Sequence, residues 1–166
     1  WAYLPKDHHD NLIDYISAPN SSEHTYGLDG ELTVITTETD TSTSSTFSIQ
    51  SVKLYFGERR GGGRYYGIDA SNARIGATPA KKPDSLLNAP FKELFKISGA
   101  MNGTNPKVPN LAEADAGFGD LAQTWSKMQS AKLRYANGSK DVLIFSGGYD
   151  TRHDEASYTS SDTEAD

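Results

Sequence analysis

The chain of 166 residues contains no cysteine, which excludes disulfide bonds, a thiol nucleophile and metal sites with cysteine ligands. Its hydrophobic share is only 36% and includes nine tyrosines, so we expect a lean core. No apolar run approaches the roughly 18 residues that a membrane helix needs. The first ten residues lack the pattern of a signal peptide. The length is that of one ordinary domain.

Charge is distributed unevenly along a chain whose net charge is -6. Residues 1–40 hold eight acids and one lysine, residues 53–82 hold seven cations and two acids, and residues 150–166 hold six acids and one arginine. This segregation suits contacts between oppositely charged segments of neighbouring molecules. The alternative interpretation is that the acids solubilise two exposed ends.

Three segments show the spacing of amphipathic helices. The first covers residues 5–17, the second runs from a cap at Asn88 to Gly99, and the third follows a cap at Asp120. Their apolar stripes would be Leu12, Ile13 and Ile16; Phe91, Leu94 and Phe95; and Leu121, Trp125 and Met128. A capping pair at Asn110 and Glu113 would start a fourth helix.

Strand patterns, rich in β-branched and aromatic residues, lie at residues 31–37, 47–56, 64–68, 132–135 and 141–145. In the second pattern the parity of apolar residues breaks near Gln50 and Ser51, which predicts a β-bulge or two strands in place of one. Asn137-Gly138 predicts a tight hairpin turn. The segment after it, Val142-Leu-Ile-Phe145, is apolar on both parities and predicts a central strand.

These elements predict one α+β domain, mainly an antiparallel β-sheet or β-sandwich with three to four short peripheral helices. Along residues 1–166 the expected parts are an N-terminal helix at 5–17, a β-hairpin region at 26–76, a helical insertion at 84–131, a β-hairpin at 132–149 and an acidic tail at 150–166. One core is expected from Val34, Val52, Leu54, Leu121, Trp125, Val142 and Ile144.

Residues 145–151, Phe-Ser-Gly-Gly-Tyr-Asp-Thr, resemble the pyrophosphate loop of ATP pyrophosphatase enzymes. That resemblance implies a parallel α/β domain in which backbone amides after a strand bind pyrophosphate. Only fifteen residues follow Thr151, too few for the crossover helices and strands of such a domain. We therefore expect a glycine turn after a strand and no phosphate site.

Two further motifs are weighed against simpler interpretations. Residues 59–66, Arg-Arg-Gly-Gly-Gly-Arg-Tyr-Tyr, look like one copy of an Arg-Gly-Gly box, but a pI near 5.2 opposes nucleic acid as a partner, and a hairpin tip that contacts protein is favoured. Residues 7–10, Asp-His-His-Asp, place neighbouring side chains about 100° apart on a helix, so they indicate a solvated helix start and no metal site.

The function that these patterns favour is a non-catalytic structural or adhesive subunit of a virion, filament or cell-surface assembly, with an extracellular, cell-surface or virion location. Its partners would be other copies of the chain or a protein assembly, and we expect no cofactor and no catalytic residue. One alternative is a carbohydrate-binding β-sandwich module, because sugars stack on aromatic rings. A second alternative is a hydrolase. The predicted partner-binding residues are Arg59, Arg60, Arg64, Tyr65 and Tyr66, and the alternative carbohydrate platform is Tyr65, Tyr66 and Trp125.

Overall fold

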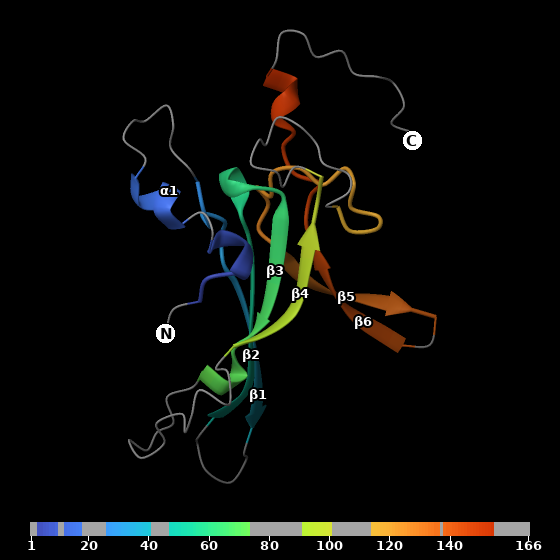
Figure 1. Cartoon of the computed structure of the whole chain (residues 1–166). Coiled ribbons are helices and arrows are strands. Elements are labelled where there is room, and N and C mark those ends of the chain that lie inside the picture. The colour runs from blue at the N-terminus through green and yellow to red at the C-terminus, as the bar shows by residue number, and fades with distance from the viewer. Residues whose placement is uncertain are drawn as a thin grey trace.

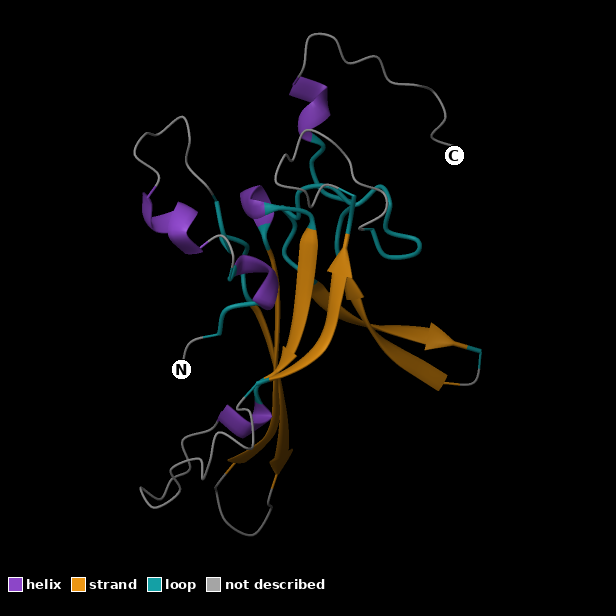
Figure 2. Ribbon diagram, viewed as in Figure 1, coloured by secondary structure: helices purple, strands orange, loops and turns teal. Residues whose placement is uncertain are grey.

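The computed structural model describes residues 3–9, 12–17, 26–40, 47–73, 91–100, 114–136 and 138–154. Its described part consists mainly of two antiparallel β-sheets (Figures 1 and 2). The first has the order β1-β2-β3-β4, and the second pairs β5 with β6. The strands are β1 (Thr33–Asp40), β2 (Phe47–Gly57), β3 (Arg64–Asp69), β4 (Lys92–Ser98), β5 (Gln129–Tyr135) and β6 (Gly138–Ile144).

The strand register confirms the predicted β-bulge. Thr37 pairs with Ser51 and Glu38 pairs with Ile49, so Gln50 is the extra residue on β2. The bulge keeps apolar side chains on consistent faces although their parity changes along the strand. The returning strand β3 and the pairing of β5 with β6 are also as predicted. Gly138 pairs with Tyr135 and belongs to β6, so the predicted turn at Asn137-Gly138 is wrong by one residue.

The predicted α+β class with three to four helices is wrong. The described residues contain one α-helix, α1 (Leu12–Ser17), of six residues. Their other helical segments are 3-10 turns: η1 (Lys6–His8), η2 (Arg59–Gly61), η3 (Ser71–Ala73) and η5 (Thr151–Asp154). The helix expected at 5–17 is thus divided into η1 and α1.

The second expected helix is strand β4. Phe95 and Ile97 face the core, and a register shift opposite Gly67 and Ile68 places Leu94 at a bulge. Adjacent apolar residues produced by a bulge imitate helical spacing, and pairing with β3 supplies the backbone hydrogen bonds. Residues 84–90 and 101–113 of the expected helical insertion, and with them the expected fourth helix at Asn110 and Glu113, lie outside the described residues.

The third expected helix is an irregular segment over residues 114–128. Its backbone bonds to other segments: the amide of Thr124 donates to Gly62 (3.2 Å), and that of Ala122 donates to Gly147 (2.8 Å). Gln123 forms an isolated bridge with Tyr149. These long-range bonds satisfy the backbone groups that a helix would satisfy internally.

The core lies between the four-stranded sheet and the root of β5–β6. Its buried members are Tyr55, Tyr65, Leu121 and Met128, and Ile35, Phe95, Ile97, Phe118, Leu143 and Phe145 pack against them. The predicted core is therefore corrected: of its seven residues only Leu121 belongs to this cluster, while Val34 and Ile144 are 53% exposed and Trp125 is 41% exposed. Neighbouring strand residues face opposite sides, and the parity of β2 and β3 that faces this core is the one that carries Tyr55 and Tyr65.

The opposite face of β3 is covered by the N-terminal segment, as Figure 1 shows from the position of η1 beside the sheet. Tyr66 and Ile68 are buried on this face, and the His8 ring lies 6.4 Å from the Tyr66 ring. β3 is therefore buried on both sides.

β5 and β6 leave the body as a two-stranded hairpin, which we call the arm (Figure 2). Leu143 near its root packs on the core, whereas most of its other side chains are exposed. The arm is therefore an edge structure, and the prediction that residues 142–145 form a central strand is wrong. No helix in the described part of the chain is long and apolar enough to cross a membrane.

Candidate functional site: an arginine–aromatic surface at the β2–β3 turn

The turn between β2 and β3 gathers two arginines and two aromatic rings from three segments of the chain. The guanidinium carbon of Arg59 lies 4.7 Å from the centre of the Trp125 ring, and that of Arg60 lies 6.0 Å from the same ring. Arg60 also lies 4.4 Å over the Tyr26 ring. Its Nε pairs with Asp29 (3.5 Å). We call Tyr26, Asp29, Arg59, Arg60 and Trp125 the arginine–aromatic surface.

Glycine allows the segments of this surface to approach. A side chain on Gly61 would collide with the backbone carbonyl of Gly27, so the turn can lie against residues 26–30 because Gly61 carries no β-carbon. The backbone amide of Arg60 then donates to the Asp29 carboxylate (3.2 Å). This contact holds Tyr26 and Arg60 side by side.

Trp125 is oriented by its neighbour Gln123. The indole Nε1 donates to the Gln123 side-chain oxygen (3.0 Å), and the Gln123 amide donates to the Arg60 carbonyl (3.4 Å). Next to it, the buried Thr124 hydroxyl accepts hydrogen bonds from the amides of Glu58 (2.8 Å) and Arg59 (3.0 Å). The 114–128 segment thus fixes both the turn and the exposed ring beside it.

Arg59 carries two unusual features. Its φ of 55° lies in the left-handed region, and it is the only described residue other than glycine with a positive φ. Its buried Nε has no hydrogen-bond partner among the residues that the structure describes. Such backbone strain and unsatisfied donors cost free energy and concentrate at functional sites.

A buried polar network lies behind this surface, centred on Glu58, which is fully buried. Its Oε1 accepts hydrogen bonds from His8 Nε2 (2.8 Å), the Tyr66 hydroxyl (2.9 Å) and Arg64 Nη1 (3.4 Å). Its Oε2 accepts from the Arg64 amide (3.2 Å). His8 Nδ1 also bonds to the Tyr15 hydroxyl. The network therefore joins the N-terminal segment to the β2–β3 turn.

The electrostatics of the network favour charged Arg64 and neutral Tyr66. Burial alone would lower the pKa of Arg64, but the Glu58 carboxylate raises that pKa above its ordinary value. Burial raises the pKa of Tyr66 far above its ordinary value, and the adjacent Glu58 charge raises it further. Tyr66 is therefore a hydrogen-bond donor to Glu58 at physiological pH.

The predicted site residues separate into two groups. Arg59 and Arg60 belong to the surface, whereas Arg64 belongs to the buried network. Tyr65 and Tyr66 are fully buried, so neither is a surface platform for a partner or a sugar in this structure. Trp125 is half-exposed, but a guanidinium covers one face of its ring.

Sequence reasoning missed Glu58, Thr124 and Asp29, and it assigned His8 to a solvated helix start although His8 is buried. His8 and Glu58 are 50 residues apart, so no local spacing could join them. Among the described residues no group of three or more His, Asp or Glu side chains could hold a metal ion.

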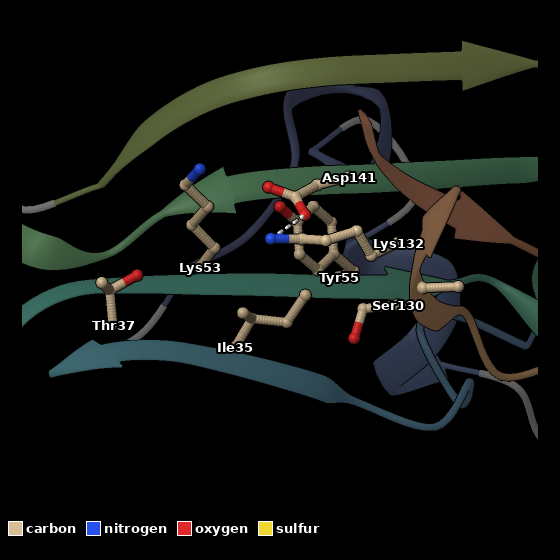
Figure 3. A pocket seen from close by; sticks show the side chains of 8 residues that line it. Ile35, Thr37, Lys53, Tyr55, Ser130, Lys132 and Asp141 are labelled. Atoms are coloured by element: carbon tan, nitrogen blue, oxygen red, sulfur yellow. Dashed lines mark ion pairs between the residues drawn. The ribbon is translucent and has the colours of Figure 1, made fainter. Parts of the chain in front are cut away.

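A second candidate is a hollow of about 370 Å³ where the arm diverges from β1 and β2 (Figure 3). Ile35, Thr37, Lys53 and Tyr55 line it from the first sheet, and Ser130, Ala131, Lys132 and Asp141 from the arm. The ion pair of Lys132 with Asp141 (3.6 Å) lies within this lining. The lining therefore combines apolar side chains with two lysines and one aspartate.

The loop that resembles a pyrophosphate site lines a further hollow, of about 340 Å³. Asp120 and Asp150 contribute to its lining, together with Gly147, Gly148 and Tyr149. These acids oppose a polyanion such as pyrophosphate. Gly148 has a φ of 93°, which is the glycine turn that the sequence predicts.

Comparisons of the chain with protein-family models, with curated proteins and with solved structures find no match. The chemistry of its own surfaces is therefore the basis for a functional proposal.

Proposed function

We propose that the protein is a non-catalytic subunit of a protein assembly, and that copies of it meet through the arm. The observation that carries the proposal is an apolar stripe on one face of β5–β6. The pairing of Ala131 with Val142 and of Gln129 with Ile144 places these side chains on the same face as Leu133 and Tyr135. Leu133 is 54% exposed, Tyr135 is 66% exposed and Ile144 is 53% exposed.

A two-stranded hairpin is only marginally stable in water unless one face packs on something. The stripe runs from Ile144 at the root to Tyr135 at the tip, where Lys140 Nζ lies 4.7 Å over the tyrosine ring. Two arms stacked face to face in opposite directions would bury the apolar middle and place each Lys140 against the uncharged root of the other. The stripe is thus self-complementary under a two-fold axis, the commonest symmetry of oligomers.

The arrangement of titratable groups supports a non-catalytic role. Glu58, His8, Arg64 and Tyr66 form a cluster of titratable groups, and the members of this cluster bond to one another in the interior. The carbohydrate-binding alternative loses support because Tyr65 and Tyr66 are buried. The proposal keeps the extracellular, cell-surface or virion location, whose support is the serine- and threonine-rich, cysteine-free composition.

The test is the molecular mass in solution, measured by analytical ultracentrifugation across a range of concentrations. We expect the parent to form a dimer or larger species. The double substitution Leu133→Ser and Tyr135→Ser should lower the measured mass to that of the monomer, because it removes the centre and the tip of the apolar stripe.

The matched control replaces Lys132→Ser and Arg134→Ser, which lie on the same strand but on its other face. Hydrogen exchange of the β5–β6 amides shows whether each variant keeps the arm paired. A parent that is monomeric at all concentrations contradicts the proposal, as does a stripe variant with a paired arm that associates like the parent.

A further inference from the structure

We infer that the arginine–aromatic surface is a binding site for a carboxylate-rich peptide segment of a protein partner. This inference concerns a different surface from the arm and does not depend on how copies associate.

The arginine–aromatic surface is positively charged. Arg59 and Arg60 bring two guanidinium groups to one exposed indole ring. In the described residues only Asp29 forms an ion pair with either of them, at 3.5 Å from Arg60. Counted over the described residues, the surface therefore carries two positive charges and one paired carboxylate, on a protein whose net charge is -6. Such a site attracts an anion to a defined place.

The Arg60 side chain is held in place before any partner binds. Arg60 is held by the Tyr26 hydroxyl (3.2 Å) and by Asp29, yet its side chain is 47% exposed. A guanidinium has five N–H donors, so its outer edge can still bind a carboxylate through two parallel bonds. Because its position is already fixed, little side-chain entropy is lost on binding.

Arg59 adopts an unfavourable conformation in the unbound chain. A glycine would adopt the φ of 55° without strain, and within the described part of the chain the buried Nε has no hydrogen-bond partner. A carboxylate that draws the guanidinium away from Trp125 would give that donor a partner and leave the ring free for an apolar side chain of the same segment. The unusual features of Arg59 thus have a use at a binding site.

The charge and size of the surface fit an acidic peptide better than a nucleic acid. Nucleic acid requires many phosphate contacts, whereas this surface offers two cations on an acidic protein. A peptide segment with a few spaced acids matches two guanidinium groups and adjacent aromatic rings. Residues 155–166 of this chain are such a segment, with four acids and no lysine, arginine or histidine, and they provide the probe.

The experiment titrates the full chain into a fluorescently labelled synthetic peptide of residues 155–166 and records fluorescence anisotropy at low salt. We expect saturable binding that weakens as salt is raised. Arg59→Gln and Arg60→Gln should each weaken it roughly tenfold, the usual effect of removing an interface arginine. Arg134→Gln, an exposed arginine on the arm, should leave it unchanged.

Two further measurements make the result decisive. Arg59→Gly should reduce binding as Arg59→Gln does while keeping or raising the melting temperature, because the strain is relieved. In the parent, the NMR signal of Arg59 Nε–H should shift on titration.

The inference is overturned if the parent shows no saturable binding, or if a peptide with its acids replaced by Asn and Gln binds equally well. It is also overturned if the Arg59 and Arg60 variants bind like the parent. Tighter binding of a single-stranded oligonucleotide through the same arginines would assign the surface to nucleic acid instead.

Discussion

Strand β3 and the arm are both antiparallel and similar in length, but they differ in how they meet solvent. Four consecutive residues of β3, Tyr65 to Ile68, are buried. In the arm, by contrast, only a few side chains near the root are even partly buried. β3 has a partner strand on each side, whereas β5 and β6 have only each other.

The difference shows where stability and recognition are located in this chain. Around β3 even charged groups are covered, and Glu58 is satisfied by His8, Arg64 and Tyr66. In the arm apolar groups such as Leu133 remain exposed. Regions with few buried contacts open most easily and are the ones available for binding. We therefore expect that substitutions around β3 strongly lower the free energy of unfolding. Substitutions in the arm should change that free energy little.

The largest expected effect comes from Glu58→Gln. The substitution removes the buried charge that pairs with Arg64, and breaking a buried pair costs about 3–5 kcal/mol of unfolding free energy. Urea denaturation measures the loss. The matched control in the arm is Asp141→Asn, whose exposed partner Lys132 lies 3.6 Å away, and its effect should be below about 1 kcal/mol. Equal losses at the two positions would remove the distinction between the regions.

A smaller contrast comes from two glycines. A β-carbon at Gly99 would overlap the backbone carbonyl of Leu121, whereas one at Gly138 would meet nothing within 4 Å. We expect Gly99→Ala to cost about 1–3 kcal/mol, because backbone must move to make room. Gly138→Ala should change stability by no more than about 0.5 kcal/mol. Thermal and urea unfolding of both variants test this, and a costly Gly138→Ala would show that the arm is packed more tightly than the structure indicates.

The sequence predicted those parts of the fold in which one local rule decides. The parity break at Gln50 predicted the bulge, and the turn residues near Gly138 predicted a hairpin there, although Gly138 itself lies in β6. Strand alternation and turn chemistry are read over a few residues, which is why these predictions succeed. The helix expected from Asn88 to Gly99 is wrong in its described part because the bulge at Leu94 imitates helical spacing. Only the partner strand β3 resolves that ambiguity.

The candidate site was predictable only in part. Arg59 and Arg60 were found because two arginines beside a glycine turn indicate an exposed tip. Arg64 lies five residues after Arg59 in the same motif, yet it points to Glu58. Its direction depends on His8 and on Thr124, which reach the turn from distant segments. Local sequence cannot encode contacts of that range.

The smallest predicted effect concerns the second link between the N-terminal segment and the sheet, from Asp7 to Lys96 (3.1 Å). Burial would raise the pKa of Asp7, but the hydrogen bond and charge of Lys96 lower it below the ordinary value of 3.8. A carboxyl whose pKa is lower in the folded chain contributes stability that is complete above the pKa of the unfolded chain. That stability is lost as the pH falls through the pKa of the folded chain.

Asp7→Asn should therefore lower the free energy of unfolding by less than about 1 kcal/mol at neutral pH, since the pair is partly exposed. The difference from the parent should close at acid pH. Urea midpoints of the two proteins at neutral pH and well below 3.8 measure it, with Lys96→Gln as the reciprocal control. If the difference persists unchanged in acid, the ion pair of Asp7 with Lys96 is not its cause, and this link does not help to hold the N-terminal segment on the sheet.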